Sequence, residues 1–170
     1  DWSSDVCSSD LITRIENKRA PIFTEKIDGT NACVVITEEG EFGCQSRSQI
    51  ITPEKDNFGF AKWAYSNKEE LMKLGPGHHF GEWWGLGIQR GYGLTEKRFS
   101  LFNTRRWGKH NPNTPACVSV VPIIMATSVE EVKAILISNG SLAALGYKNI
   151  EGAVMYEPDT DTCFKIIINK

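Results

Sequence analysis

Charged side chains recur at the ends of apolar segments, or inside them, where surface residues are not expected. They are Lys26, Arg47, Glu82, Glu151 and Lys165. A charge in a buried strand is costly unless it is paired or binds a ligand. We therefore expect these five side chains to share one cleft that holds both signs of charge. The alternative is that each is a strand-edge charge or part of a structural ion pair.

Lys26 is the candidate nucleophile, because it directly precedes an Asp28-Gly29 turn at the end of an apolar segment. A turn explains the aspartate and the glycine, but it does not explain the lysine. Two basic groups near the amine would disfavour its protonated form and free it to attack. Such an amine can attack a phosphorus atom when positive charge also collects the phosphates.

Three other residues suit the binding of a nucleotide and its metal ion. An acid such as Glu82 or Glu151 can accept a hydrogen bond from a ribose hydroxyl, or hold a magnesium ion. Magnesium would shield the phosphate from the carboxylates and stabilise the charge that develops during transfer. Phe102 stands at the end of an apolar segment and can stack on a purine.

The segments that must position these residues predict more strands than helices. Strands are expected in 20–27, 78–87, 98–104 and 115–126, and hairpins in 31–47 and 151–169. A helix is expected in 52–67 with Thr52 as its N-cap, a short one in 68–74, and one in 128–139 with a Ser128–Glu131 capping box. This order indicates an α+β domain with largely antiparallel sheets.

Length and charge set further bounds. The 170 residues suffice for one domain with a substantial core. No apolar run approaches the roughly 20 residues that span a bilayer. The net charge of -2 gives no general attraction to nucleic acid, so such a site must be a local basic patch. The segment 103–110, "NTRRWGKH", is either such a patch or a solvated loop.

The five cysteines are scattered and form no CxxC pair. We expect reduced thiols in a cytoplasmic protein, without a zinc site or disulfide framework, and with Cys33 and Cys163 in buried strands. The glycine-rich segment 85–91, "GLGIQRG", lacks the spacing of a dinucleotide fingerprint, and we interpret it as a plain loop. Residues 1–11 have no structural period, so we expect a non-native or disordered leader before a domain at 12–170.

The segment "EKIDGTN" resembles the K-x-D-G nucleophile motif of the covalent nucleotidyltransferases, the superfamily of ATP-dependent ligases and capping enzymes. The Thr30-Asn31 pair that follows is most similar to the RNA ligases. Further motifs of that family occur in the same order: "SRS" at 46–48, "GEWWG" at 81–85, "FSLFN" at 99–103, "EGAV" at 151–154 and "FKI" at 164–166. The resemblance implies a nucleotidyltransferase (ATP-grasp-like) fold, with ATP and Mg²⁺ as cofactors.

The resemblance also implies catalytic roles. Lys26 would attack the α-phosphate of ATP, release pyrophosphate and become a lysyl-adenylate. The AMP would then pass to an RNA 5′-phosphate, and a 3′-hydroxyl would displace it to seal the strand. Lys165 would contact the α-phosphate, Glu151 would serve the metal, and Asp28 and Asn31 would position the lysine and the reacting ends.

The remaining implied roles concern the nucleoside. Glu25 would lie beside the adenine, and its backbone would help to recognise the base. Arg47 would contact the ribose or the phosphorylated RNA end, and Glu82 would bind the ribose. Phe102 and Val154 would stack on opposite faces of the adenine.

Two departures from the family pattern stand out. The last motif of the family often carries two lysines, and here only Lys165 is present. The chain also stops just after this motif, where family members commonly continue into a C-terminal domain that engages RNA. We therefore expect a fragment of a longer product. A DNA ligase, a capping guanylyltransferase and a catalytically silent nucleotide- or RNA-binding module remain the alternatives.

Overall fold

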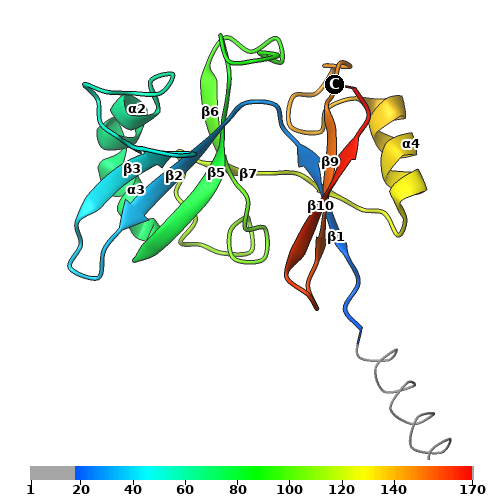
Figure 1. Ribbon diagram of the computed structural model, residues 1–170, viewed down its shortest axis with the longest axis horizontal. Helices are drawn as coiled ribbons and strands as arrows, with labels where there is room; N and C mark the ends of the chain where they lie inside the picture. Colours follow the sequence, from blue (N-terminus) through cyan, green and yellow to red (C-terminus); the bar gives the residue numbers. More distant parts are fainter. Residues whose placement is uncertain (1–17, 170) are drawn as a thin grey trace, which may run out of the picture.

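The computed structural model describes residues 18–169, and the expectation about residues 1–11 lies outside this range. Within this range two β-sheets lie side by side, and each has its helical part on the face turned away from the other sheet: two helices on the large sheet and one on the small sheet (Figure 1). Nearly all strand pairs are antiparallel, as expected, and the one parallel pair joins β6 to β7. The α+β class predicted from the sequence is confirmed.

The small sheet has the strand order β10-β9-β1-β8. Its strands are β1 (Ile22–Lys26), β8 (Ile123–Ile124), β9 (Gly152–Glu157) and β10 (Thr162–Ile167). One face of this sheet packs against α4 (Val129–Asn139) through Phe23, Ala153 and Ile166. Because successive side chains alternate between the faces of a strand, Thr24, Lys26 and Val154 belong to the opposite face.

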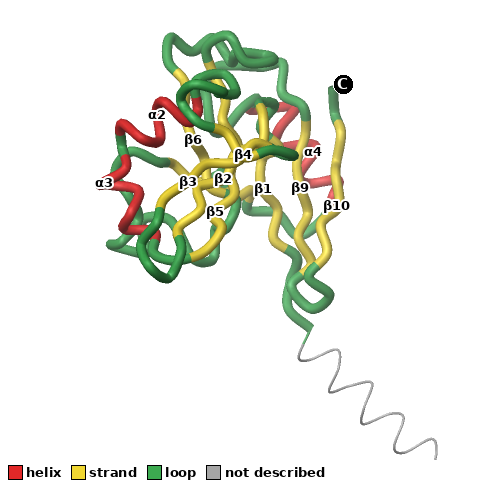
Figure 2. Tube along the Cα trace, turned by 60° about the vertical axis from the view of Figure 1, so that its left-hand side comes forward, coloured by secondary structure: helices red, strands yellow, loops and turns green. Residues whose placement is uncertain are grey.

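The large sheet has the strand order β4-β3-β2-β5-β6-β7. Its strands are β2 (Thr30–Ile36), β3 (Phe42–Ser46), β4 (Ile50–Ile51), β5 (Gly77–Gly85), β6 (Lys97–Leu101) and β7 (Ser119–Val120). Val34, Trp83 and Phe99 point from one face into the main hydrophobic core. That core is closed by α2 (Phe60–Ser66), α3 (Lys68–Leu71) and the 3₁₀ turn η1 (Met72–Leu74), which Figure 2 shows on the outer side of the large sheet.

Two connections join the sheets close to the expected nucleophile. The segment 27–29 leads from the end of β1 in the small sheet to β2 in the large one (Figure 1). The segment 115–126, expected to be a strand with a break at Pro122, is divided by that proline between the two sheets: β7 lies in the large sheet and β8 in the small one. Ile27, Trp84 and Val121 share a hydrophobic cluster at this junction.

The α4 helix confirms its predicted N-terminus, whereas the helix expected from residue 52 begins later than predicted. The Ser128 hydroxyl accepts a hydrogen bond from the Glu131 N–H at 3.2 Å, as in a capping box. Thr52 caps only a tight turn, where its hydroxyl accepts from the Lys55 N–H. The first turn of α2 is capped by Asp56, whose carboxylate accepts from two of the N–H groups that a helix start leaves unpaired.

Of the two cysteines expected in buried strands, one is buried. Cys33 is buried, but Cys163 is exposed. The reason is that β10 is the edge strand of the small sheet, and Cys163 lies on the face opposite to the α4 contact. Within residues 18–169, no helix is both long enough and apolar enough to cross a membrane.

Candidate active site

The Lys26 amine lies against the carboxylate of Glu151, with its Nζ 3.2 Å from each of the two oxygens. Lys26 is the last residue of β1 and pairs with Gly152, so the sheet register brings residue 151 beside the end of β1. At Gly152 a side chain could not be accommodated, since an added Cβ would lie 1.9 Å from the Ile166 carbonyl oxygen. Both side chains are partly exposed, at 23% for Lys26 and 19% for Glu151, which leaves the pair open to a ligand.

The charge observed beside the Lys26 amine is that of a carboxylate. Two neighbouring basic groups would disfavour the protonated amine, whereas the ion pair with Glu151 favours it. An amine can act as a nucleophile only after it loses that proton.

Glu82 comes close to the same pair through the turn that follows Lys26. Gly29 packs so tightly on β5 that an added Cβ would lie 2.4 Å from the Trp83 carbonyl oxygen and 2.7 Å from the Trp84 Cβ. This approach lets the Gly29 N–H donate to the Glu82 carboxylate. The glycine of the K-x-D-G sequence is thus required by the contact between the turn and β5.

The environment of Glu82 changes its ionisation. Burial raises the pKa of the Glu82 carboxyl to about 7, because desolvation disfavours the charged form. The positive charge of Lys26 and the Gly29 N–H oppose this increase, while the negative charges of Glu151 and Asp28 add to it. Lys26, Asp28, Glu82 and Glu151 therefore form one electrostatically coupled group.

A hollow of about 230 Å³ lies on the face of the large sheet opposite to its core. Asn31, Arg47 and Phe102, all singled out from the sequence, line it together with Phe80. Asn31 pairs directly with Glu82 across β2 and β5, so the hollow adjoins the coupled acidic and basic groups. The Phe102 ring is 44% exposed and Phe80 is 56% exposed, and two open aromatic rings can stack on a flat ligand.

Val154 and Lys165 lie opposite each other on β9 and β10. Val154 also pairs with Thr24, two residues before Lys26, so all three positions share the face of the small sheet that is turned away from α4. Lys165 is exposed. Lys26 and Lys165, the two lysines expected to be catalytic, therefore lie on the same face of the small sheet.

Two expected site residues are engaged within the protein. The Glu25 carboxylate is buried and accepts hydrogen bonds from the Ser141 hydroxyl and from the N–H groups of Leu142 and Ala143. The Glu25 N–H donates to the Pro122 carbonyl at 3.0 Å. The expected contact of Glu25 with adenine remains a prediction. Asp28 forms an ion pair with the Nε of Arg90 at 3.1 Å.

Arg90 and Tyr92 are the site residues that sequence reasoning missed. Arg90 belongs to the glycine-rich segment 85–91 that we interpreted as a plain loop, Tyr92 directly follows that segment, and both reach Asp28. The only available signal was an arginine and a tyrosine among closely spaced glycines, which does not by itself predict their partner. No group of three or more potential metal ligands occurs among residues 18–169.

The comparisons with known proteins identify the family of the chain. The family model for RNA ligase matches residues 20–167, and the chain therefore belongs to the RNA ligase family. No curated protein matches it at a significant level.

Solved structures of Naegleria gruberi RNA ligase share the fold. An apo aspartate-to-alanine mutant is 25% identical with a TM-score of 0.60, and the match covers 92% of this chain and 51% of that chain. The same ligase with PPi is 25% identical with a TM-score of 0.59, covering 93% and 52%. A lysine-to-alanine mutant with ATP and Mn is 24% identical with a TM-score of 0.60, covering 92% and 52%. The chain thus spans about half the length of these ligases.

Proposed function

We propose that this chain is the nucleotidyltransferase domain of an ATP-dependent RNA ligase. Lys26 attacks the α-phosphate of ATP, pyrophosphate leaves, and the lysine holds AMP through a phosphoramide bond. The AMP then passes to an RNA 5′-phosphate, and an RNA 3′-hydroxyl displaces it to form the phosphodiester. Membership of the RNA ligase family supports this sequence of steps.

The observation that carries the proposal is the position of the Lys26 amine. It stands at the junction of the two sheets, paired with Glu151, coupled to Glu82 and partly open to solvent. A buried structural ion pair would not need the adjoining hollow lined by Asn31, Arg47 and Phe102. We infer that adenosine occupies this hollow, with the base on Phe102 and the ribose toward Glu82.

The remaining residues then take consistent roles. Val154 covers the second face of the adenine, and Lys165 approaches the α-phosphate from β10. Arg47 meets the ribose or the RNA 5′-phosphate, for which its planar guanidinium is well suited. Glu25 shapes the base pocket through the segment 141–143 that it holds, and Asp28 and Asn31 position the lysine and the RNA ends.

A divalent ion fits the residues present. Mg²⁺ commonly binds to one or two carboxylates together with substrate phosphates, and it keeps several waters. Glu151 would be its protein ligand, so the lack of a larger cluster of ligands is no obstacle. When bound, the ion would neutralise phosphate charge during transfer. An ion at Glu151 would also weaken the hold of that carboxylate on Lys26.

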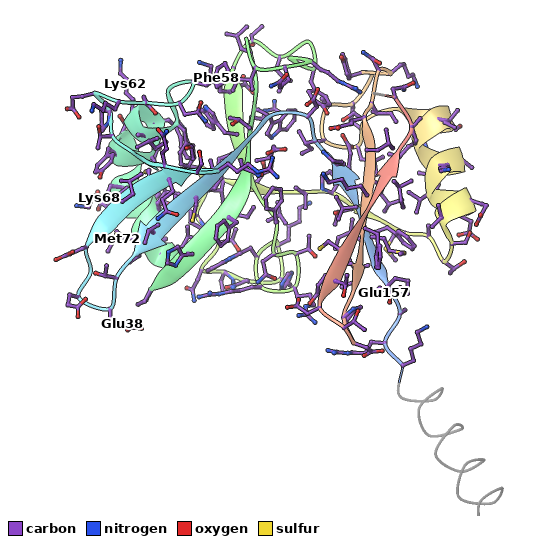
Figure 3. All side chains as sticks on the ribbon, in the orientation of Figure 1. Glu38, Phe58, Lys62, Lys68, Met72 and Glu157 are labelled. Carbon is purple, nitrogen blue, oxygen red and sulfur yellow. The ribbon has the colours of Figure 1, made fainter. Side chains whose placement is uncertain are left out.

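The test is covalent labelling. The protein is incubated with ATP labelled at the α-phosphate and with Mg²⁺, and a denaturing gel shows whether the label stays attached. We expect an adduct that disappears in Lys26→Ala and when Mg²⁺ is chelated. Lys62→Ala is the matched control, because Lys62 is an exposed lysine on α2 at the outer side of the molecule (Figure 3).

Each other outcome identifies a different function. Labelling by GTP but not ATP indicates a capping guanylyltransferase. No adduct with either nucleotide, but retained nucleotide or RNA binding, indicates a silent binding module and refutes the proposal. If the adduct forms, parallel reactions on nicked RNA, nicked DNA and single-stranded RNA distinguish an RNA ligase from a DNA ligase.

A further inference from the structure

The loop between β5 and β6 has an unusual backbone for a plain connection. Gln89 and Tyr92 both have positive φ angles, of 46° and 53°, with glycines at 87, 91 and 93 that also have positive φ. Residues with a Cβ are strained in this region of φ, so the surrounding structure must hold them there. Ile88 is fully buried and anchors the loop. The loop is therefore built to present particular side chains.

Arg90 is the first of these side chains, and its guanidinium contacts three separate segments. The Nε is 3.1 Å from Asp28 Oδ2, and the side chain is only 12% exposed. One terminal nitrogen donates to the Asn149 carbonyl at 3.0 Å, and the other to the Asn169 carbonyl at 2.8 Å. All three kinds of guanidinium nitrogen are thus in use, on one carboxylate and two backbone carbonyls.

These three segments are the ones that carry the candidate active-site groups. Asp28 is two residues beyond Lys26, and Asn149 is two residues before Glu151. Asn169 follows β10, the strand of Lys165, and its N–H donates to the Glu151 carbonyl at 3.1 Å. The Arg90 side chain therefore links three segments, which lie next to Lys26, next to Glu151 and after the strand that carries Lys165.

Tyr92 contacts the same turn from the same loop. Its hydroxyl accepts a hydrogen bond from the Asp28 N–H at 2.7 Å, and the side chain is almost fully buried. Its ring packs edge-on against Trp84 and lies 4.8 Å from the Tyr147 ring. The side chain and the N–H of Asp28 are thus both held by the loop.

We infer that Arg90 is a positioning residue, which holds the Lys26 turn in register with Glu151 and with the end of β10, while Tyr92 fixes the backbone of the turn. This inference rests on the proposed function, because it concerns the aim of the Lys26 amine. Lysine cannot replace the arginine, since an ammonium is a point charge and cannot make three divergent contacts in one plane. The K-x-D-G aspartate, on this account, acts as the anchor for a loop that lies 60 residues away in the sequence.

The test compares Arg90→Lys with the matched control Arg19→Lys. Arg19 also contacts a carboxylate and a carbonyl, those of Asp159 and Pro158, but on the exposed surface. We expect Arg90→Lys to lower the rate of lysyl-adenylate formation at saturating ATP by about tenfold to a hundredfold, as misplacement of a reacting group does. The apparent affinity for ATP and the melting temperature should change little, and Arg19→Lys should match the unmodified chain.

A second readout does not depend on activity. Hydrogen exchange of the segment 26–30 should be faster in Arg90→Lys and in Tyr92→Phe, and unchanged in Arg19→Lys. If the unmodified protein forms no adduct, the proposed function fails, and the exchange measurement still decides the inference. The inference is overturned if hydrogen exchange of segment 26–30 is unchanged in both variants. It is also overturned if the adenylation rate and the ATP affinity of Arg90→Lys fall by the same factor as its folded fraction.

Discussion

Replacing Glu82 with glutamine should change how the stability of the protein depends on pH. Burial raises the pKa of this carboxyl from an ordinary 4.5 to about 7. The folded protein therefore holds the proton more tightly than the unfolded chain does. Between about pH 4.5 and about pH 7 the unfolded chain has released this proton while the folded protein still holds it, so the free energy of unfolding falls as the pH rises.

The size of this loss follows from the pKa difference. Each unit of pKa corresponds to about 1.4 kcal/mol, so the partly buried Glu82 carboxyl costs about 3 kcal/mol of folding free energy once the pH is above 7. Below pH 4.5 it costs nothing, because it is protonated in both states. Glu82→Gln stays neutral at every pH, and its amide oxygen can still accept from the Gly29 N–H.

The assay is urea unfolding of both proteins at several values of pH between 4.5 and 8. The free energy of unfolding of Glu82→Gln, relative to that of the unmodified protein, should rise by about 3 kcal/mol across this range, with most of the rise between pH 5 and 7. The pKa of His79 is lowered by burial, and its contribution to the pH dependence is common to both proteins and cancels in the difference.

A third protein tests the cause. The positive charge of Lys26 lowers the pKa of Glu82, so Lys26→Met should move the Glu82 transition to higher pH. Parallel stability curves for the unmodified protein and Glu82→Gln would refute the reasoning. They would mean that Glu82 is solvated, and that it is not coupled to the lysine turn.

Two further predictions concern residues that hold the site in place. Glu25→Gln should destabilise the protein by about 3 kcal/mol in urea unfolding, because a buried carboxylate that accepts three hydrogen bonds becomes an amide facing the same donors; a loss below about 1 kcal/mol would contradict the buried network. Asp56→Ala should cost about 1–2 kcal/mol by removing the cap of α2, and Thr52→Ala should cost clearly less. The reverse order would contradict the assignment of Asp56 as the side chain that stabilises the start of α2.

The sequence could predict α2 as a helix but not its start. Thr52 followed by Pro53 has the composition of a helix N-terminus, and Asp56 is equally suited to capping. Local preference does not choose between them, because each side chain can satisfy an N–H nearby. Phe60 decides the matter by packing into the large-sheet core, so the helix can only begin where its first turn reaches that core.

The sequence could likewise predict a strand but not which of its residues are buried. The apolar run that contains Cys163 predicts a strand, and the strand β10 is present. Whether that strand lies at the centre or the edge of its sheet depends on which partners it finds elsewhere in the chain. Among residues 18–169, β10 has one partner, β9, and Cys163 lies on the face turned away from α4, so Cys163 is exposed, whereas Cys33 on the central β2 is buried.

The amino-acid sequence by itself determined the class of the domain, the order of its strands along the chain and the spacing of Lys26, Asp28 and Gly29. These are local properties, set by alternation of apolar residues, turn chemistry and motif spacing. Only the tertiary structure decided that Lys26 meets Glu151, that Glu82 is buried enough to hold a proton, and that Arg90 binds Asp28. Such contacts join residues more than 50 positions apart, and they depend on strand register and on loop conformation, which no local pattern encodes.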